Sequence, residues 1–153
     1  MKLPFPFFTL TLWALVALFS SVPVEATAGM VAETSELIRN AGPRPPDAAP
    51  GANWWYYGVV LKETSGKSGI RLTGWSKCYI TRDDVGCENV RSNFQKLYGT
   101  DRIPPGGEIR LLKPAWVWAK KTGNAYEVEG SYWGLDDNGN KVRASYRLKF
   151  RSD

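Results

Sequence analysis

The chain has 153 residues, 43% of them hydrophobic, and a formal net charge of +5 at pH 7. This length suits one globular domain with additional segments, and the moderate positive charge favours anionic partners without requiring one. The sequence contains no histidine, which excludes Ser-His-Asp and Cys-His nucleophilic catalysis, histidine-based nuclease chemistry and histidine-ligated zinc.

Residues 1–28 have the features of a secretory signal peptide. An apolar run follows the initial Met-Lys, and the segment ends in VEATA, where Ala26 and Ala28 form a small-x-small cleavage pattern, with cleavage after Ala26 as a second option. A membrane anchor is the alternative, but the run contains two prolines and is followed by Pro23 and Glu25 rather than by basic residues. We therefore expect a secreted protein, extracellular or periplasmic if the source is bacterial, with no transmembrane segment after cleavage.

Residues 29–53 are expected to form a Pro- and Ala-rich N-terminal segment and linker. The stretch 39–53, RNAGPRPPDAAPGAN, contains four prolines and shows no apolar periodicity, which is typical of a flexible, partly polyproline-like segment. The preceding AETSELIRNAG fits two helical turns that end at Gly42, although so short a helix is marginal on its own. The secreted β-rich domain is therefore expected over 54–153.

Two strands begin this domain. Residues 54–63, WWYYGVVLKE, have apolar side chains at both odd and even positions. Both faces of a strand here would be apolar, which predicts a central strand. Residues 69–81 alternate as a half-buried strand does, and the two segments are expected to form a β-hairpin around SGKSG. One side of the second strand would carry Ile70, Leu72, Cys78 and Ile80, and the other Arg71, Thr73, Lys77 and Thr81.

Cys78 and Cys87 are the two cysteines of the chain. In an exported protein they have no competing partner, so we expect a disulfide between them. The Cys-x8-Cys spacing without histidine matches neither a zinc site nor a Cys-x-x-Cys redox site.

Residues 89–98 contain the one helix that the pattern predicts in the domain. Val90, Phe94 and Leu97 lie on one helical face, Asn89 suits the N-cap, and Gly99 suits the C-terminal stop. Strand patterns resume after this helix and continue to the C-terminus. We therefore expect an α+β fold that is mostly β, with about six antiparallel strands in a curved sheet or small barrel and the helix packed on it.

The last two strands predict a hairpin whose register depends on its turn. A two-residue Asn138-Gly139 loop would set Glu127 and Glu129 against apolar side chains, which is unfavourable. A three-residue loop with Gly139 in a left-handed bulge removes this conflict. The favoured register pairs Glu127 with Lys149, Glu129 with Arg147, Ser131 with Ser145, Trp133 with Arg143, Val128 with Leu148 and Tyr126 with Phe150.

An aromatic and basic face beside this hairpin is the candidate binding site. A two-residue Gly123-Asn124 turn would place Trp116 and Trp118 next to Trp133, and Arg143 would lie within cation–π reach of Trp133. Two alternatives stay open, because a three-residue turn sends both tryptophans into the core and the helix could cover them. The candidate site consists of Trp116, Trp118, Trp133, Lys141, Arg143 and Arg151.

The sequence favours a secreted non-catalytic binding domain, for example an effector or inhibitor, that presents this face to a protein, a glycan or another anionic partner. No cofactor, metal site or nucleic-acid motif is indicated. A small carboxylate-dependent hydrolase is the alternative, because glycoside hydrolysis needs only two carboxylates. A cell-envelope assembly domain is a third option.

Overall fold

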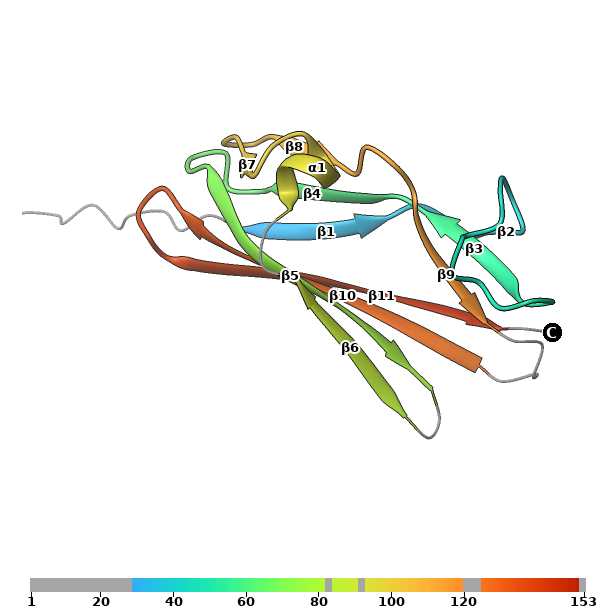
Figure 1. Cartoon of the computed structure of the whole chain (residues 1–153). Coiled ribbons are helices and arrows are strands. Elements are labelled where there is room, and N and C mark those ends of the chain that lie inside the picture. Colours follow the sequence, from blue (N-terminus) through green and yellow to red (C-terminus); the bar gives the residue numbers. More distant parts are fainter. Residues whose placement is uncertain (1–28, 82–83, 91–92, 120–124, 152–153) are drawn as a thin grey trace, which may run out of the picture.

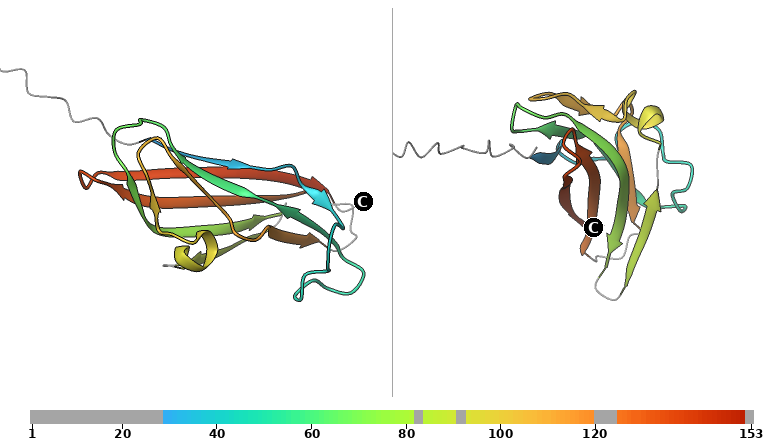
Figure 2. Two further views of the ribbon diagram at one scale, coloured as in Figure 1. Left: turned by 90° about the horizontal axis from the view of Figure 1, so that it is seen from above. Right: turned by 90° about the vertical axis from the view of Figure 1, so that its left-hand side faces the viewer.

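The computed structural model describes residues 29–81, 84–90, 93–119 and 125–151. Its strands form two layers that face each other (Figures 1 and 2). The expected fold class is confirmed: the described part of the chain is mostly antiparallel β structure with one short helix, and its sheets do not close into a barrel. The predicted signal peptide over 1–28 lies outside the described residues.

The first layer is a sheet in the order β11-β10-β5-β6, with β7 also pairing with β5. We call it the five-stranded sheet. Its strands are β5 (Ile70–Ile80), β6 (Val85–Val90), β7 (Arg102–Ile103), β10 (Ala125–Asp136) and β11 (Lys141–Arg151).

The opposite layer consists of two small sheets, in the orders β1-β4-β8 and β2-β3-β9. A short helix, α1 (Phe94–Tyr98), follows β6. The strands of this layer are β1 (Met30–Thr34), β2 (Ile38–Arg39), β3 (Asn53–Tyr57), β4 (Val59–Glu63), β8 (Glu108–Arg110) and β9 (Ala115–Ala119).

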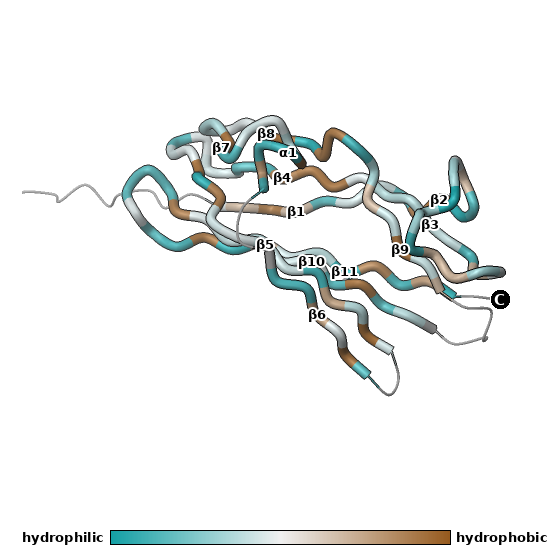
Figure 3. Tube along the Cα trace, in the orientation of Figure 1, coloured by the Kyte–Doolittle hydropathy of each residue, from teal (hydrophilic) through white to brown (hydrophobic). Residues whose placement is uncertain are grey.

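The hydrophobic core lies between the layers. Leu61 of β4 and Val128 of β10 are fully buried, and Trp55 of β3 packs against Phe150 of β11 with ring centres 4.9 Å apart. Figure 3 shows hydrophobic and hydrophilic residues alternating along β10 and β11. This alternation is expected of strands with one buried and one solvated face.

The structure corrects the prediction of a linker over 29–53. Residues 30–34 form β1, which pairs with β4, and Ile38 and Arg39 pair with β3, so the predicted helical turns are also absent there. Residues 40–52 form a loop that packs on the domain, with Pro45 fully buried and the Tyr56 hydroxyl donating to the Pro43 carbonyl oxygen. Proline excludes regular pairing within this loop, but its side chains still contribute to the packed domain.

The predicted hairpin between residues 54–63 and 69–81 is wrong. Strand β4 pairs with β1 on one edge and with β8 on the other, whereas β5 pairs with β10 and β6. The first two strong strand patterns therefore lie in opposite layers. Sequence adjacency favours a hairpin, but here distant strands occupy both edges of β4, and β5 forms its hairpin with β6, the strand that follows it.

A β-bulge in β5 reverses the predicted alternation. Trp133 pairs with Gly74 and the next residue, Gly134, pairs with Leu72, so Thr73 is the extra residue. One inserted residue moves every later side chain to the other face of the sheet. Ile70 and Leu72 face the core as predicted, but beyond the bulge Trp75, Lys77 and Tyr79 face inward and Cys78 and Ile80 face outward.

The helix is shorter than predicted. It spans Phe94–Tyr98, because β6 continues to Val90 where the helical face over 89–98 was expected to begin. Asn93 precedes it without a side-chain capping bond, so Asn89 is not the N-cap. The stop at Gly99 is confirmed: its φ of 76° is left-handed, a conformation that glycine adopts without strain.

The C-terminal hairpin has the predicted register. Glu127 pairs with Lys149, Glu129 with Arg147 and Trp133 with Arg143. Gly139 closes the three-residue loop with a φ of 83°. Asp136 is buried at this turn, where its carboxylate accepts hydrogen bonds from Asn138 and Asn140.

Candidate functional site

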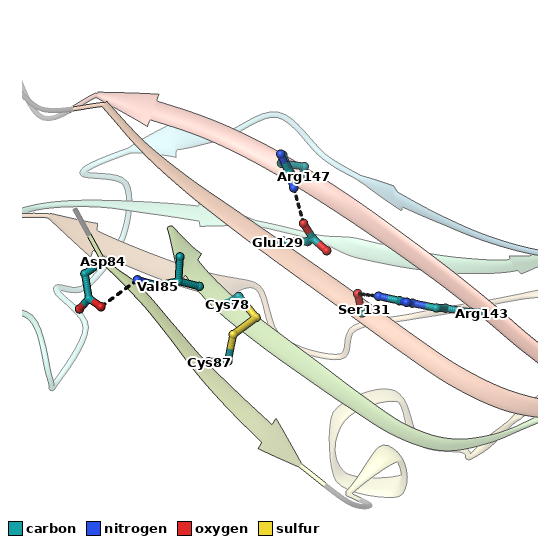
Figure 4. The surroundings of a disulfide bond; sticks show 8 residues. All are labelled: Cys78, Asp84, Val85, Cys87, Glu129, Ser131, Arg143 and Arg147. Atoms are coloured by element: carbon teal, nitrogen blue, oxygen red, sulfur yellow. Dashed lines mark hydrogen bonds and ion pairs between the residues drawn. A yellow bond between two sulfur atoms is a disulfide. The ribbon is translucent and has the colours of Figure 1, made fainter. Parts of the chain in front are cut away.

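The outer face of the five-stranded sheet carries four of the six predicted binding residues: Trp133, Lys141, Arg143 and Arg151. The guanidinium of Arg143 lies 5.8 Å from the Trp133 ring centre, so the predicted cation–π contact is present. The same guanidinium donates to the Ser131 hydroxyl at 3.1 Å (Figure 4). Trp133 itself is half-buried.

Neighbouring cations on this face are engaged with carboxylates. Arg147 lies 2.6 Å from Glu129, and Lys149 lies 3.1 Å from Glu127 (Figure 4 shows the first pair). The predicted Cys78–Cys87 disulfide is confirmed and joins β5 to β6 on the same face. Most of the polar groups named here therefore bind one another, as cross-strand pairs do on the solvated side of a sheet.

Trp116 and Trp118 lie elsewhere, on β9 of the opposite layer. β9 pairs with β3, whereas the two neighbours of β10 are β11 and β5, so the predicted pairing of β9 with β10 is wrong. The Gly123-Asn124 turn on which that pairing depended lies outside the described residues. The structure therefore does not bring Trp116 and Trp118 together with Trp133 and Arg143.

The 40–52 loop covers these two tryptophans. The Asp47 carboxylate accepts hydrogen bonds from the indole nitrogens of Trp116, at 3.0 Å, and Trp118, at 3.4 Å. Trp116 keeps 38% of its surface exposed, and Trp118 is half-buried. A covering helix was one of the open alternatives, but the segment that contacts the two tryptophans is the Pro-rich loop.

A pocket of about 550 Å³ opens between the layers. We call it the inter-layer pocket. Strands of both layers, the helix and the segment before β9 contribute to it, and aromatic and aliphatic side chains form most of its wall. Its lining residues are Asp47, Tyr57, Trp75, Lys77, Tyr79, Glu88, Lys96, Leu97, Leu111, Lys113, Pro114, Ala115, Trp116, Tyr132 and Tyr146.

Lys77 is the charged group that the bulge turns into this pocket. Its Nζ lies 5.6 Å from the ring centre of Tyr57 and 5.1 Å from that of Tyr79. It donates one hydrogen bond, 2.7 Å long, to the carbonyl oxygen of Trp116 on β9. An ammonium group has three N–H donors, so this contact leaves donors that can serve a ligand.

Burial lowers the pKa of Lys77 to about 8, because transfer from water disfavours the charged form, while Glu88 and Asp47 act in the opposite direction. Glu88 is its cross-strand neighbour on β6. At pH 7 about a tenth of Lys77 is therefore the neutral amine, far more than for a lysine with an ordinary pKa.

Four tyrosines form the floor of the pocket and the core beneath it. The Tyr57 and Tyr146 hydroxyls lie 3.1 Å apart, and the Tyr98 hydroxyl donates to Tyr132 at 2.8 Å. Burial is the main cause that raises the pKa of each of them. They are neutral phenols at physiological pH, and Tyr57, Tyr132 and Tyr146 line the pocket itself.

Trp75 adds a donor without an acceptor. Its indole Nε1 is buried and has no hydrogen-bond partner among the described residues. Such a group carries a desolvation cost of about 1–3 kcal/mol. Trp75 and Lys77 both offer hydrogen-bond donors to the pocket, whose lining also contains the carboxylates of Asp47 and Glu88 and the ammonium groups of Lys96 and Lys113.

Trp75, Lys77 and Tyr79 are not among the residues predicted for the site, because one unbroken alternation was expected through residues 69–81. A signal was present at Gly74, since glycine inside a strand pattern often marks a bulge. Placing the bulge there would have turned all three side chains inward.

Two acidic side chains that a carboxylate-dependent hydrolase could use are already occupied by hydrogen bonds outside the pocket. Glu63 is buried and accepts backbone hydrogen bonds from Ser65, Gly66 and Gly106 at 2.6 to 2.8 Å. Asp137 accepts from the backbone of Gly69 and from Arg102. Asp47 and Glu88 are the carboxylates that line the inter-layer pocket in the described structure.

Among the described residues, no cluster of three or more Cys, Asp or Glu side chains could hold a metal ion. The helix in that part of the chain is too short to cross a membrane.

No protein-family model matches the sequence, and no curated protein matches it. Solved structures that are similar in fold include the following two. A protein from Bordetella pertussis assigned as ApaA has a TM-score of 0.55 at 11% identity, over 80% of this chain and 94% of that one. A structural genomics target designated SoR45 has a TM-score of 0.52 at 12% identity, over 82% of this chain and 85% of that one. At these identities the likeness concerns the fold alone.

Proposed function

We propose that this protein is a secreted, non-catalytic binding domain whose ligand occupies the inter-layer pocket. The pocket, about 550 Å³ in volume with Lys77 held against two tyrosine rings, is the observation that carries the proposal. Sites for small ligands commonly have this size, a mainly apolar wall and a few polar groups that orient the ligand.

The donors in the wall favour a ligand with an acceptor or an anionic group. Lys77 has N–H groups beyond the one bound to Trp116, and the Trp75 indole has no acceptor. The proposed ligand is an apolar molecule, or an inserted aromatic group of a protein or glycoconjugate, that carries such an acceptor. This retains the anionic partner expected from the sequence but moves its site from the outer face to the pocket.

Secretion is part of the proposal. The disulfide between Cys78 and Cys87 supports it, because such bonds persist mainly in oxidising compartments. A role as an exported effector or inhibitor would fit a small binding domain of this kind.

The outer face gives less support for binding. Its Arg143 is bound to Ser131 and Trp133, and Arg147 is bound to Glu129, so a ligand would first have to displace these contacts. The hydrolase alternative is also weakly supported, because Glu127 and Glu129 form ion pairs on this outer face.

Titration with 8-anilinonaphthalene-1-sulfonate, an aromatic anion that fluoresces in apolar sites, tests the proposal. We expect Lys77→Met to weaken binding by about fivefold or more, because it removes a partly desolvated charge worth about 1 kcal/mol. Lys141→Met is the matched control, with the same charge change on the other face of the same sheet, and should alter affinity by less than about twofold. Weakening by Lys141→Met or Arg143→Met with Lys77→Met unaffected would return the site to the outer face.

A further inference from the structure

We infer that Lys77 is a carbonyl-reactive amine, which captures apolar aldehydes in the inter-layer pocket as a reversible imine. The inference rests on the proposed function, since it requires that the pocket accept an apolar ligand. It goes further by assigning a covalent step and a reactive atom, Nζ of Lys77.

The position of Lys77 Nζ meets the geometric need of this reaction. The atom belongs to a side chain that lines the pocket, and it is held by one hydrogen bond to Trp116 and by the rings of Tyr57 and Tyr79. In the neutral amine that hydrogen bond uses one of two N–H groups. The nitrogen lone pair is then available to a carbonyl carbon placed against the aromatic wall.

The surroundings of Lys77 increase its fraction of neutral amine relative to that of an exposed lysine. Burial lowers its pKa to about 8, and Glu88 of β6 and Asp47 of the 40–52 loop oppose this without cancelling it. Lysines desolvated in apolar pockets are known nucleophiles for carbonyl substrates. The other titratable groups that line the pocket are Tyr57 of β3, Tyr79 of β5, Lys96 of α1, Lys113 before β9, Tyr132 of β10 and Tyr146 of β11.

The reaction balances with the aldehyde as the sole co-reactant. The Nζ lone pair forms a bond to the carbonyl carbon, and the carbonyl π electrons move to oxygen, which takes up a proton as nitrogen loses one. The resulting carbinolamine loses its hydroxyl group with a proton as water, and nitrogen gives up its second proton. One amine and one aldehyde therefore yield one imine and one water.

The apolar wall would also protect the product. Imines return to amine and aldehyde by attack of water, and a ligand that fills the pocket limits access of water to the bond. The substrate class is accordingly an aldehyde with an aromatic or aliphatic body, and small hydrophilic aldehydes should be captured poorly.

The experiment treats the protein with 2-naphthaldehyde at pH 7 and reduces any imine with sodium cyanoborohydride, and peptide mass spectrometry then locates the adducts. We expect at least about tenfold more adduct on Lys77 than on an ordinary lysine, because a pKa near 8 leaves far more neutral amine at pH 7 than the usual 10.4. Lys96 and Lys113 line the same pocket and serve as internal controls. Lys77→Arg, which keeps the cation, should abolish the excess adduct.

Binding of 2-naphthalenemethanol, the corresponding alcohol, separates the two proposals because it cannot form an imine. If the alcohol binds and the aldehyde labels Lys77 preferentially, both proposals are supported. If the alcohol binds but Lys77 is labelled no more than Lys96 and Lys113, the imine inference is overturned and the pocket proposal remains. If the alcohol does not bind, the proposed function fails for this ligand class, and the imine inference, which requires that binding, is overturned with it.

Discussion

The Nζ atom of Lys77 in the five-stranded sheet donates a 2.7 Å hydrogen bond to the carbonyl oxygen of Trp116 in the opposite layer. This contact spans the inter-layer pocket and links a residue placed by the β5 bulge to an edge strand held by the 40–52 loop. The candidate site therefore depends on two features, a bulge and a covering loop, that lie far apart in the sequence.

Gly130→Ala should destabilise the protein and disturb the pocket. A Cβ at Gly130, opposite both Lys77 and Tyr146 in the sheet, would overlap the ring of Tyr146. We expect a loss of about 1–3 kcal/mol in the free energy of unfolding, as for other overpacked cores. Urea denaturation followed by tryptophan fluorescence measures it.

Gly86→Ala is the matched control for this substitution. Gly86 lies in the same sheet on β6, and a Cβ there meets no atom within 4 Å. Its alanine variant should stay within about 0.5 kcal/mol of the wild type. Equal stability of both alanine variants would contradict the close packing of Tyr146 against Gly130.

Removing the disulfide should lower the free energy of unfolding without changing the fold. The double variant Cys78→Ser, Cys87→Ser lacks the bond that closes a sequence separation of 9 residues. Chain entropy predicts a loss of about 2.7 kcal/mol in the free energy of unfolding for a loop of about this length. Urea midpoints of the variant and of reduced wild type should agree with each other and lie below that of the oxidised protein. Identical midpoints for all three would contradict a stabilising role for the bond.

Glu63 should make stability depend on pH in the acid range. Burial alone would raise its pKa, but hydrogen bonds from the Ser65 side chain and from the backbone of Gly106, Ser65 and Gly66 outweigh this and lower the pKa from 4.5 to about 2. Because the folded-state value lies below the unfolded one, the ionised carboxylate stabilises the fold above pH 4.5. That contribution is lost as the pH falls from 4.5 towards 2.

Glu63→Gln should therefore lose about 1–2 kcal/mol at pH 7, because the amide nitrogen faces a backbone donor. Its free energy of unfolding should also fall less than that of the wild type between pH 4.5 and 2. Glu108→Gln changes an exposed, ion-paired carboxylate on β8 and is expected to cost less than about 1 kcal/mol. A wild type whose pH dependence matches that of Glu63→Gln would disprove this role.

Local patterns were enough to predict the C-terminal hairpin and the disulfide. Unbroken alternation in the last strand, together with the cost of burying Glu127 and Glu129, selects one register. Gly139 supplies the left-handed residue that this register requires. These features depend on neighbours in sequence or on a single pair of cysteines, so sequence reasoning can reach them.

The candidate site could not be predicted in this way. Its inward residues depend on one extra residue, Thr73, and a strand pattern contains no clear mark of a bulge beyond Gly74. The Pro-rich composition of 40–52 suggested a linker, but composition does not report that Asp47 binds two indoles far along the chain. Likewise, β4 pairs with β1 and β8, which are distant in the sequence. The local alternation of apolar and polar residues does not determine which strands pair with β4.

The indole N–H signals of the tryptophans offer the most direct test of where the ligand binds. The sequence has seven tryptophans, and among them Trp75 and Trp116 line the pocket whereas Trp133 lies on the outer face. In a two-dimensional ¹H–¹⁵N NMR titration with 8-anilinonaphthalene-1-sulfonate, binding in the pocket predicts large shifts for Trp75 and Trp116 and none for Trp133. Shifts of Trp133 with Trp75 and Trp116 unmoved would contradict the account.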